Sequence, residues 1–403
     1  MILYNLGIFL LDLGIRLASI FNKKAAKLVN GRKDSMRLLK QFHQTIQPNA
    51  TIYWFHCASL GEFEQARPLM EAIRATQPEI RFVVSFFSPS GYEIQKNYAL
   101  ADLVFYLPCA TASNATLVID CIKPEKIFFI KYEFWIHFIQ TAYRRNIPVY
   151  LVSALFNPNQ IFFKWYGKIY LNLLPRYKCI FVQDVDSITL LKKHGIASKL
   201  SGDTRFDRVL VNKAKAQDFD IIQAFISNQK VLVLGSSWHD EERILFKAVD
   251  DNLSFKIVIA PHDITRTINV PSNFSSLRFS EATLENVTQA QVLIIDNIGM
   301  LASLYRCANV ALVGGGFRAS LHNILEAAVY GIPVLYGNQT NKHPEAEQLV
   351  AAGGGVIFHN EVELKTQLQL LFQDEFLQKK MGESASRFIE NNAGATSKIL
   401  AEI

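Results

Sequence analysis

Short apolar runs alternate with amphipathic stretches along almost the whole chain, and this alternation predicts strands separated by helices. In the first half, we expect strands at 51–56, 81–86, 103–106, 126–130, 149–152 and 179–182. In the second half, we expect strands at 230–234, 256–259, 292–295, 310–313, 333–336 and 356–358. Apolar strands that alternate with helices are typical of parallel sheets covered by helices on both faces.

The number of strands bears on the number of domains. About twelve strands are too many for one ordinary doubly wound sheet, and the polar stretch 213–229 separates the two sets. We therefore predict two Rossmann-like parallel-sheet domains that face a central cleft. The predicted parts are an N-terminal helix (1–33), a first domain (34–212), a linker (213–229), a second domain (230–385) and a final helix (386–403) that could pack back on the first domain.

The N-terminal segment carries a narrow polar stripe and a wide apolar face if residues 3–28 form one helix. The stripe consists of Asn5, Asp12, Arg16, Ser19, Lys23 and Lys27. One interpretation is an amphipathic helix in the plane of a membrane, with its apolar face in the lipid and its bases on anionic head groups. The other is a helix that caps a domain core and has a solvated basic end. The pattern alone leaves both open.

The charge distribution adds a second region. The formal net charge is +6, a mild surplus without the dense basic footprint of a nucleic-acid-binding protein. Residues 1–33 hold six bases and one acid, and residues 134–183 hold no acid among many aromatic side chains. A charge run is usually a solvated surface, but two such zones favour an anionic, partly apolar partner. The candidate acceptor or membrane contacts are Arg16, Lys23, Lys24, Lys27, Lys164 and Lys168.

The cysteines and the apolar N-terminus bear on whether the chain has disulfides, a zinc site or a membrane-spanning segment. The five cysteines are odd in number and form no C-x-x-C pair, which argues against a disulfide framework or a zinc site and fits a reducing compartment. The charge-free run 1–11 is too short to span a bilayer and lacks the features of a signal peptide. No segment therefore demands that the chain cross a membrane.

The first predicted strand runs into the motif HCASLGE (56–62) and then into a helix. Ser59 can cap that helix, and Glu62 lies in its first turn, where a strand end faces the cleft. A carboxylate there can act as a general base that takes a proton from an attacking hydroxyl. It can also serve only to complement the helix dipole, and spacing alone favours this simpler role.

A glycine-rich loop follows the strand predicted at 310–313. Gly314, Gly315 and Gly316 precede a helix expected to start near Leu321. The loop amides and the helix end could bind a phosphate, with His322 and Glu326 on one helix face to address the nucleotide. The glycines could also serve only a turn that needs a positive φ.

Two smaller polar loops follow other strands of the second half, namely GSSWHDEE (235–242) and Pro261-His262-Asp263. His262 could donate a hydrogen bond to a phosphate. Each loop alone is more often a turn or a helix cap than a binding site. Their convergence on one edge of a sheet favours a site.

The ordered set of motifs resembles the 3-deoxy-D-manno-octulosonic acid (Kdo) transferases of lipopolysaccharide assembly. The motifs are HCASLGE (56–62), KYEFW (131–135), VSALF (152–156), GDTRFD (202–207), GSSWHDEE (235–242), APH (260–262), GGGF (314–317), HNILEAAVYGIPVLYG (322–337) and KHPEA (342–346). They cover nearly the whole chain in order, and their combination is specific although each is weak alone. The resemblance implies the GT-B fold and transfer of Kdo from CMP-Kdo to a lipid A precursor (lipid IVA), with inversion at the anomeric carbon and without a metal or other cofactor.

The resemblance also implies roles for individual residues. Glu62 is the expected general base, and Glu133, in the family's E-x-W segment, is expected to assist catalysis or to hold the acceptor. The expected nucleotide and phosphate site consists of Ser236, Ser237, Pro261, His262, Gly314, Gly315, Gly316, His322, Asn323 and Glu326. Two departures put individual phosphate contacts in question. The arginine that commonly precedes the histidine is absent from Ala260-Pro261-His262, and Ser320-Leu321 replaces two frequent glycines.

The sequence thus predicts a Kdo transferase that lies on the cytoplasmic face of the inner membrane as a peripheral or monotopic protein. Its expected partners are CMP-Kdo, a lipid A precursor and an anionic membrane surface, with no nucleic acid. One alternative is a GT-B glycosyltransferase that uses a UDP-sugar and a soluble acceptor. Another is a non-catalytic protein that binds a sugar nucleotide or lipid on the same scaffold.

Overall fold

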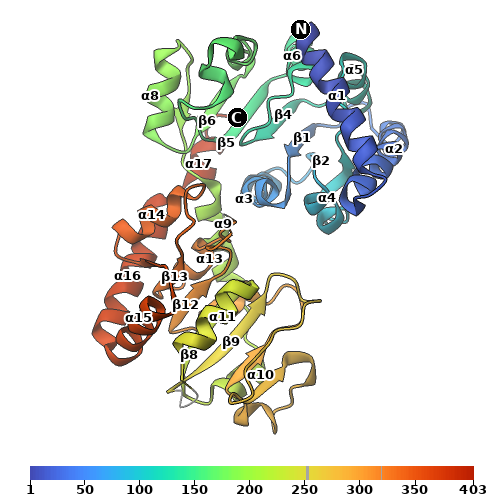
Figure 1. The fold of residues 1–403 in the computed structure, drawn as a ribbon. Helices are drawn as coiled ribbons and strands as arrows, with labels where there is room; N and C mark the ends of the chain where they lie inside the picture. The colour runs from blue at the N-terminus through green and yellow to red at the C-terminus, as the bar shows by residue number, and fades with distance from the viewer. Residues whose placement is uncertain (251–253, 319) are drawn as a thin grey trace. The chain divides into compact units, whose positions relative to one another are not determined.

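The computed structural model describes residues 1–250, 254–318 and 320–403. The chain forms two compact units, each of which is described by itself (Figure 1). The N-terminal unit consists of residues 1–208 and 393–403, and the C-terminal unit consists of residues 209–392.

The N-terminal unit is built around a seven-stranded parallel sheet of order β3-β2-β1-β4-β5-β6-β7. Its strands are β1 (Ile52–Cys57), β2 (Arg81–Phe86), β3 (Ala101–Tyr106), β4 (Lys126–Ile130), β5 (Val149–Ala154), β6 (Cys179–Val182) and β7 (Lys199–Leu200). Successive residues of a strand face opposite sides of the sheet. Trp54 and Phe129 belong to one apolar cluster, whereas Tyr53 and Phe128 belong to another. Burial on both faces explains why these strands are continuous apolar runs in the sequence.

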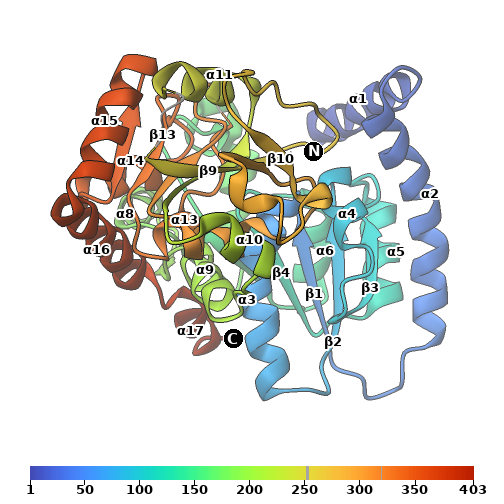
Figure 2. The same ribbon diagram turned by 90° about the horizontal axis from the view of Figure 1, so that it is seen from below.

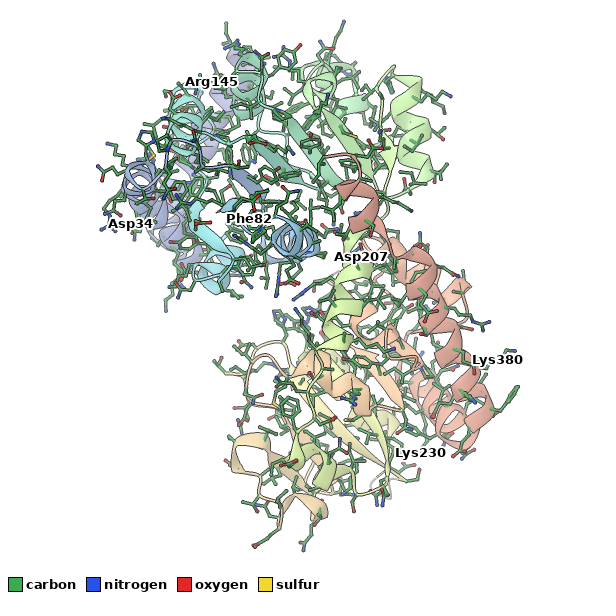
Figure 3. The ribbon with its side chains drawn as sticks, turned by 180° about the vertical axis from the view of Figure 1, so that it is seen from behind. Asp34, Phe82, Arg145, Asp207, Lys230 and Lys380 are labelled. Atoms are coloured by element: carbon green, nitrogen blue, oxygen red, sulfur yellow. The ribbon has the colours of Figure 1, made fainter. Side chains whose placement is uncertain are left out.

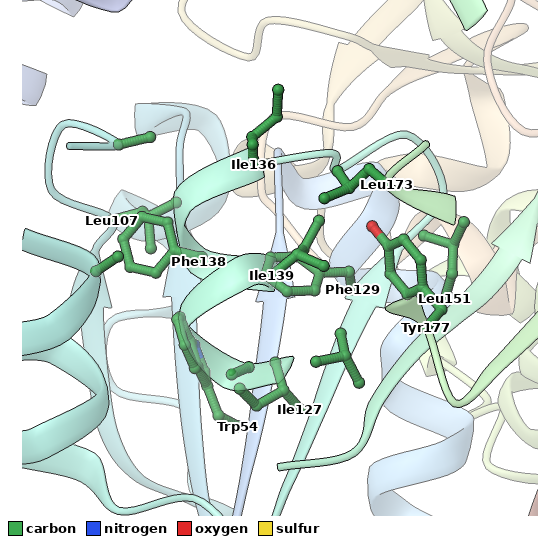
Figure 4. Packing of buried hydrophobic residues seen from close by; sticks show 14 of the residues in the cluster. Trp54, Leu107, Ile127, Phe129, Ile136, Phe138, Ile139, Leu151, Leu173 and Tyr177 are labelled. Atoms are coloured by element: carbon green, nitrogen blue, oxygen red, sulfur yellow. The ribbon is translucent and has the colours of Figure 1, made fainter. Parts of the chain in front are cut away.

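Helices cover both faces of this sheet (Figure 1). They are α1 (Ile2–Ala18), α2 (Lys23–Gln44), α3 (Leu60–Thr76), α4 (Pro89–Gln95), α5 (Ala112–Ile122), α6 (Ile136–Arg144), α7 (Lys168–Leu171), α8 (Val185–Lys193) and α17 (Ala395–Leu400), with the short turns η1 (Ile161–Phe163), η2 (Trp165–Gly167) and η3 (Leu174–Arg176). Figure 4 shows Phe138 and Ile139 of α6 packed over Trp54, Ile127 and Phe129 of the sheet. On the other face, α3 contributes a buried stripe of its own.

The C-terminal unit repeats this plan with a seven-stranded parallel sheet of order β10-β11-β9-β8-β12-β13-β14. Its strands are β8 (Lys230–Ser237), β9 (Phe255–Pro261), β10 (Ser276–Arg278), β11 (Val292–Ile294), β12 (Val310–Val313), β13 (Val334–Gly337) and β14 (Gly355–Phe358). Its helices are α10 (Asp220–Ile226), α11 (His239–Ala248), α12 (Leu301–Leu304), α13 (Leu325–Ala328), α14 (Pro344–Ala351), α15 (Glu361–Gln373) and α16 (Glu375–Asn392), with the turns η4 (Phe279–Glu281), η5 (Val287–Gln289) and η6 (Tyr305–Cys307).

Both sheets have a point where the strand order reverses, at β1 and β4 in the first and at β8 and β12 in the second. Ligands of open parallel sheets bind outside the carboxyl ends of the strands at such points. The twelve strands predicted from the sequence are all present. The prediction missed β7 and β10, which have two and three residues and carry no fully buried side chain.

The predicted single helix over 3–28 is wrong, because the segment forms α1 and α2 with a bend of 118° between them. Asn22 ends the first helix region and caps the second, since its side chain accepts hydrogen bonds from the amides of Lys24 and Ala25. Figure 2 shows α1 leaving α2 at this bend. Among the described residues, no single helix is long and apolar enough to cross a membrane, and only this bent pair passes such a test jointly.

The division of the chain also differs from the predicted one. The predicted linker 213–229 holds the end of α9 (Thr204–Ala214) and the whole of α10, and the C-terminal unit already begins at Val209. Helix α10 is part of a core because Ile222 and Phe225 are buried. The predicted helix 386–403 is two helices, since α16 ends in the C-terminal unit at Asn392 and α17 belongs to the N-terminal unit.

Asp207 ties the last helix of the chain to the N-terminal unit. Its carboxylate accepts hydrogen bonds of 2.6 Å from the amides of Gly394 and Thr396 and from the Thr396 hydroxyl. Figure 3 shows Asp207 beside this helix. A carboxylate at a helix N-terminus satisfies amides that have no partner within the helix.

Candidate active site

Glu62 lies just beyond the carboxyl end of β1, in the first turn of α3. Its Oε2 accepts a hydrogen bond of 3.1 Å from the Ser59 amide and a second one from the Ser59 hydroxyl. Together with the Ser59 side chain, which accepts from the Gly61 amide, this forms a capping box. Glu62 therefore does cap its helix, and its side chain stays only half-buried.

Glu133 follows β4, the neighbour of β1 in the sheet. It is buried, and its Oε2 accepts hydrogen bonds from Nε2 of His56, at 2.9 Å, and from the Trp135 indole. On the far side of the imidazole, Nδ1 of His56 lies 2.8 Å from Oγ of Ser85, which accepts from the Trp54 indole at 2.8 Å. Because a carboxylate only accepts hydrogen bonds, Nε2 of His56 is the donor in its contact with Glu133.

The two candidate carboxylates are close enough to act on the same neighbour. Burial raises the pKa of the Cys57 thiol well above its usual value, and the charges of Glu62 and Glu133 raise it further. Burial also raises the pKa of Tyr132 to about 12, with a contribution from the Glu62 charge. The structure thus brings Glu62 and Glu133 to one edge of the sheet and keeps the Cys57 thiol protonated at neutral pH.

The amides of Gly314 and Gly315 have partners within the protein, and phosphate binding by this loop stays a prediction. The Gly314 amide donates to the Gly235 carbonyl at 2.9 Å, and the Gly315 amide donates to Oε1 of Glu241 at 2.9 Å. The Glu241 carboxylate is fully buried and also accepts from the Trp238 amide at 3.2 Å. Burial raises its pKa. An internal carboxylate thus accepts the hydrogen bond of the Gly315 amide.

Close packing explains the three glycines, in line with their simpler interpretation. Gly315 has a φ of +87°, and a Cβ there would lie 2.2 Å from the Ser320 carbonyl oxygen. A Cβ at Gly314 would lie 2.2 Å from the Ser236 carbonyl oxygen, and one at Gly316 would lie 2.4 Å from the Gly337 amide. The backbone itself fills the space that side chains would need.

The other residues predicted for the nucleotide site differ in their hydrogen-bond partners and in their position in the backbone. The buried Ser237 hydroxyl donates to Glu242 at 2.6 Å, and Glu242 pairs with Arg266. Helix α13 begins at Leu325 rather than near Leu321, so His322 and Glu326 do not share a helix face. Asn323 instead donates to Glu326 at 3.2 Å. Ser236 adopts a positive φ of 52°, and Pro261 is the last residue of β9.

A row of nitrogen-bearing side chains lies at the carboxyl edge of this sheet. The rings of Trp238 and His262 stack with centroids 4.6 Å apart, and the His262 and His322 rings lie 4.5 Å apart. The Arg318 guanidinium lies 5.1 Å from the centroid of the Trp238 ring, and its Nε donates to Asp240 at 2.8 Å. Burial and the neighbouring histidines lower the pKa of His322 to about 4, so this ring is neutral at neutral pH. His262 and Arg318 are exposed, and Arg318 keeps further N–H groups beside its pair with Asp240, so both side chains can donate to an anion.

In helix α1, Asn5 and Asp12 contact the rest of the unit, and most of the large apolar side chains are exposed. Asn5 contacts Nε2 of His137 at 2.7 Å, and Asp12 pairs with the half-buried Arg32 at 3.3 Å. The large apolar side chains of the first 21 residues that remain exposed are Met1, Ile2, Leu3, Leu6, Phe9, Leu10, Leu11, Leu13, Leu17, Ile20 and Phe21. A contiguous apolar surface of this kind marks an interaction site.

The basic candidates flank this apolar surface. Lys23, Lys24 and Lys27 are exposed around the start of α2, and Arg16 is exposed although it pairs with Asp12. Lys168 is exposed and Lys164 is half-exposed in the second acid-free zone. The rings of Tyr4 and Tyr170, 6.3 Å apart, bring the two zones together on one unit.

The sequence interpretation did not single out several residues that the structure places at these edges. They are His56, Ser85, Trp135, Trp238, Glu241 and Arg318. Most of them lie within the quoted motifs. Their position beside the predicted site residues is the feature of the sequence that could have identified them. Ser85 lies outside every motif and could be found only in the folded chain. Among the described residues, no group of three or more His, Cys, Asp or Glu side chains could hold a metal ion, and metal independence stays a prediction.

Comparison with known proteins bears on the family. The family described as "3-Deoxy-D-manno-octulosonic-acid transferase (kdotransferase)" matches residues 32–208. The 3-deoxy-D-manno-octulosonic acid transferase of Aquifex aeolicus (strain VF5) is 27% identical over 78% of this chain and 84% of its own length. The enzyme of the same name from Chlamydia muridarum (strain MoPn / Nigg) is 23% identical over 86% of this chain and 84% of its own length.

Solved structures bear on the fold. The UDP-GlcNAc 2-epimerase of Neisseria meningitidis, bound to UDP-GlcNAc, superposes with a TM-score of 0.60 at 18% identity and covers 88% of this chain and 98% of its own. The corresponding epimerase of Methanocaldococcus jannaschii has a TM-score of 0.54 at 14% identity and covers 85% of this chain and 99% of its own. This likeness confirms the predicted GT-B type of fold with two parallel-sheet domains, and the central cleft stays a prediction. The motifs, the family match over residues 32–208 and the relatives all make the chain similar to the Kdo transferases.

Proposed function

We propose that this protein transfers Kdo from CMP-Kdo to a lipid A precursor at the cytoplasmic face of the inner membrane. The observation that carries this proposal is the presence, on one unit, of the two carboxylates Glu62 and Glu133 and of an apolar helix turned outward. A transferase with a lipid acceptor needs a base for the acceptor hydroxyl and a surface that can lie on lipid. Relatives named Kdo transferases over most of the chain support the donor sugar.

The reaction we propose is a single displacement with inversion. Glu62 takes the proton of an acceptor hydroxyl as its oxygen attacks C2 of Kdo. The bond from C2 to the phosphate oxygen breaks, and its electron pair leaves with CMP. His262 and Arg318 stabilise the departing phosphate by donating hydrogen bonds, in place of the loop amides. No metal or cofactor takes part in these steps.

Glu133 has a different part in this proposal. Its Oε2 is held by both His56 and Trp135, so its position is fixed before the acceptor arrives. A fixed carboxylate can accept a hydrogen bond from an acceptor hydroxyl and orient the attacking oxygen. We therefore assign acceptor positioning to Glu133 and proton transfer to Glu62.

The test of the reaction is mass spectrometry of the lipid after incubation with CMP-Kdo and a lipid A precursor. We expect the acceptor to gain the mass of Kdo and CMP to be released in equal amount. Thermal protection separates the alternatives, because a ligand that binds the folded protein raises its melting temperature. Protection by UDP but not by CMP would favour a UDP-sugar transferase, and CMP binding without release of CMP from CMP-Kdo would favour a non-catalytic protein.

The membrane part of the proposal is tested by substitution on α1. Leu6→Asp and Phe9→Asp change side chains that are 51% and 62% exposed, so the fold should tolerate them. We expect both to weaken co-sedimentation with anionic vesicles, because a charge does not enter the lipid boundary readily. Val362→Asp and Phe376→Asp, at exposed apolar positions of the C-terminal unit, are matched controls. Equal binding by all four variants would contradict this orientation.

A further inference from the structure

A groove of about 590 Å³ lies in the N-terminal unit between α1 and the segment 160–170. Leu3, Gly7 and Leu11 of α1 form one wall, and Ile161 and Phe162 contribute to the other. Aliphatic and aromatic side chains dominate its lining. A volume of this size is typical of a small-molecule site.

The inner end of the groove is the candidate active site. Glu133 and Trp135 both line it, and they are joined by the hydrogen bond from the indole to the carboxylate. Tyr132 also lines the groove, and the Glu62 charge contributes to the raised pKa of that tyrosine. A molecule in the groove can therefore reach Glu133, and Glu62 lies at the same edge of the sheet.

The outer end of the groove meets the apolar surface of α1. Leu3 lines the groove and is 84% exposed, and its neighbours Ile2 and Leu6 are also exposed. On the other side, Trp165 is 91% exposed next to the turn that carries Ile161. The groove thus connects the surface that we propose to lie on lipid with the edge of the sheet that holds Glu133.

We propose that this groove binds a fatty acyl chain of the acceptor. The inference rests on the proposed function, because it takes the acceptor to be an acylated saccharide. When the hydroxyl of such a saccharide lies at Glu62 and Glu133, its acyl chains must leave the site along a path that does not bury polar groups without partners. The groove offers such a path from the carboxylates to the lipid surface. Each buried methylene group contributes to acceptor affinity.

Two glycines of α1 allow a matched test. A Cβ added at Gly7 or at Gly14 meets no atom within 4 Å, so both positions accept a side chain without a clash at its Cβ. Gly7 lines the groove, whereas Gly14 lies two turns further along the same helix and does not line it. Gly7→Phe therefore fills the groove, and Gly14→Phe is the control with the same gain in helix propensity.

The first measurement is direct binding of a dansyl-labelled medium-chain alcohol to the full-length protein, followed by fluorescence. This probe carries no charge at neutral pH and is not repelled by Glu133. We expect Gly7→Phe to raise its Kd by about tenfold or more, since several methylene contacts are lost, and Gly14→Phe to leave the Kd unchanged. Equal Kd values for the two variants would overturn the proposal.

The second measurement is steady-state transfer to an acylated acceptor. We expect Gly7→Phe to raise the KM for this acceptor and to leave kcat and the KM for CMP-Kdo unchanged. A change in oligomeric state with unaltered probe binding would assign the groove to a second copy of the chain and overturn the proposal. Failure of the unaltered protein to transfer Kdo contradicts the proposed function instead, and probe binding does not depend on that result.

Discussion

Helix α3 of the N-terminal unit and helix α11 of the C-terminal unit both have a glutamate in the first turn that accepts a hydrogen bond from the backbone at the start of its helix, but the two glutamates differ in burial. In the N-terminal unit, Glu62 folds back onto Ser59, and in the C-terminal unit Glu241 folds back onto the Trp238 amide. Glu62 remains half-buried, whereas Glu241 is fully buried and also takes the amide of Gly315. A glutamate three residues into a helix thus becomes a candidate base in one unit and an internal bridge between two loops in the other. The difference lies in the loop packed above it, since only the C-terminal unit places a glycine-rich turn there.

The largest expected effect is on catalysis at Glu62. Glu62→Gln keeps a side chain that can cap α3 but cannot take a proton, so we expect the rate of Kdo transfer to fall by about 10²–10⁴-fold. The melting temperature should change little. The measurement is release of CMP from CMP-Kdo in the presence of acceptor. Glu79→Gln, at an exposed glutamate outside the site, is the control. Near-normal turnover of Glu62→Gln would show that Glu62 is not the general base.

The next effect is on stability at Glu241. Glu241→Ala leaves the amides of Gly315 and Trp238 without their acceptor, and we expect the free energy of unfolding to fall by about 2–3 kcal/mol. Glu62→Ala should cost less, about 0.5–2 kcal/mol, because it removes only a helix cap near solvent. Urea unfolding of both variants compares the two. A larger loss for Glu62→Ala would reverse the assignment of roles.

A smaller effect is expected at the nitrogen-bearing edge of the C-terminal unit. Arg318→Leu removes a cation beside the Trp238 ring, and we expect the KM for CMP-Kdo to rise by about tenfold. Arg243→Leu, at an exposed arginine of α11, is the matched control. Equal KM values for the two variants, measured at saturating acceptor, would place the nucleotide elsewhere.

The last prediction is a pH dependence of stability due to His322, which vanishes at neutral pH. Its folded-state pKa of about 4 lies below the usual value of 6.5, because burial disfavours the charged ring. Between these two values the unfolded chain binds the proton more readily, so stability falls as the pH falls from about 6.5 toward 4. His322→Asn should lose this component. The test is the difference between the two proteins in urea unfolding at several pH values, and parallel curves would contradict it.

Much of the fold was predictable because parallel strands buried on both faces are continuous apolar runs in the sequence. The exceptions have physical reasons. Strand β7 has two exposed residues and no apolar run to detect. The break at Asn22 was hidden because the apolar spacing of α1 and α2 joins into one plausible helix, while the asparagine cap that separates them is a single side chain.

The candidate site was predictable to a different extent in each unit. Glu62 and Glu133 could be named from their motifs, and the structure places both at one sheet edge. The contact of Glu133 with His56 joins residues 77 positions apart, which spacing cannot indicate. The sequence could not show whether the Gly315 amide is open to a ligand, because that depends on whether the Glu241 carboxylate accepts its hydrogen bond in the folded chain.

The sequence by itself determined the order of most strands and helices, the likeness to the Kdo transferases and the choice of the two candidate carboxylates, because these follow from local patterns and from motifs in order. Only the tertiary structure decided which face of α1 turns outward. Periodicity shows which residues share a helix face, but not which face meets a partner. Here Asn5 contacts the buried His137 and Asp12 pairs with the half-buried Arg32, so this side of α1 meets the unit and most of the large apolar side chains stay exposed.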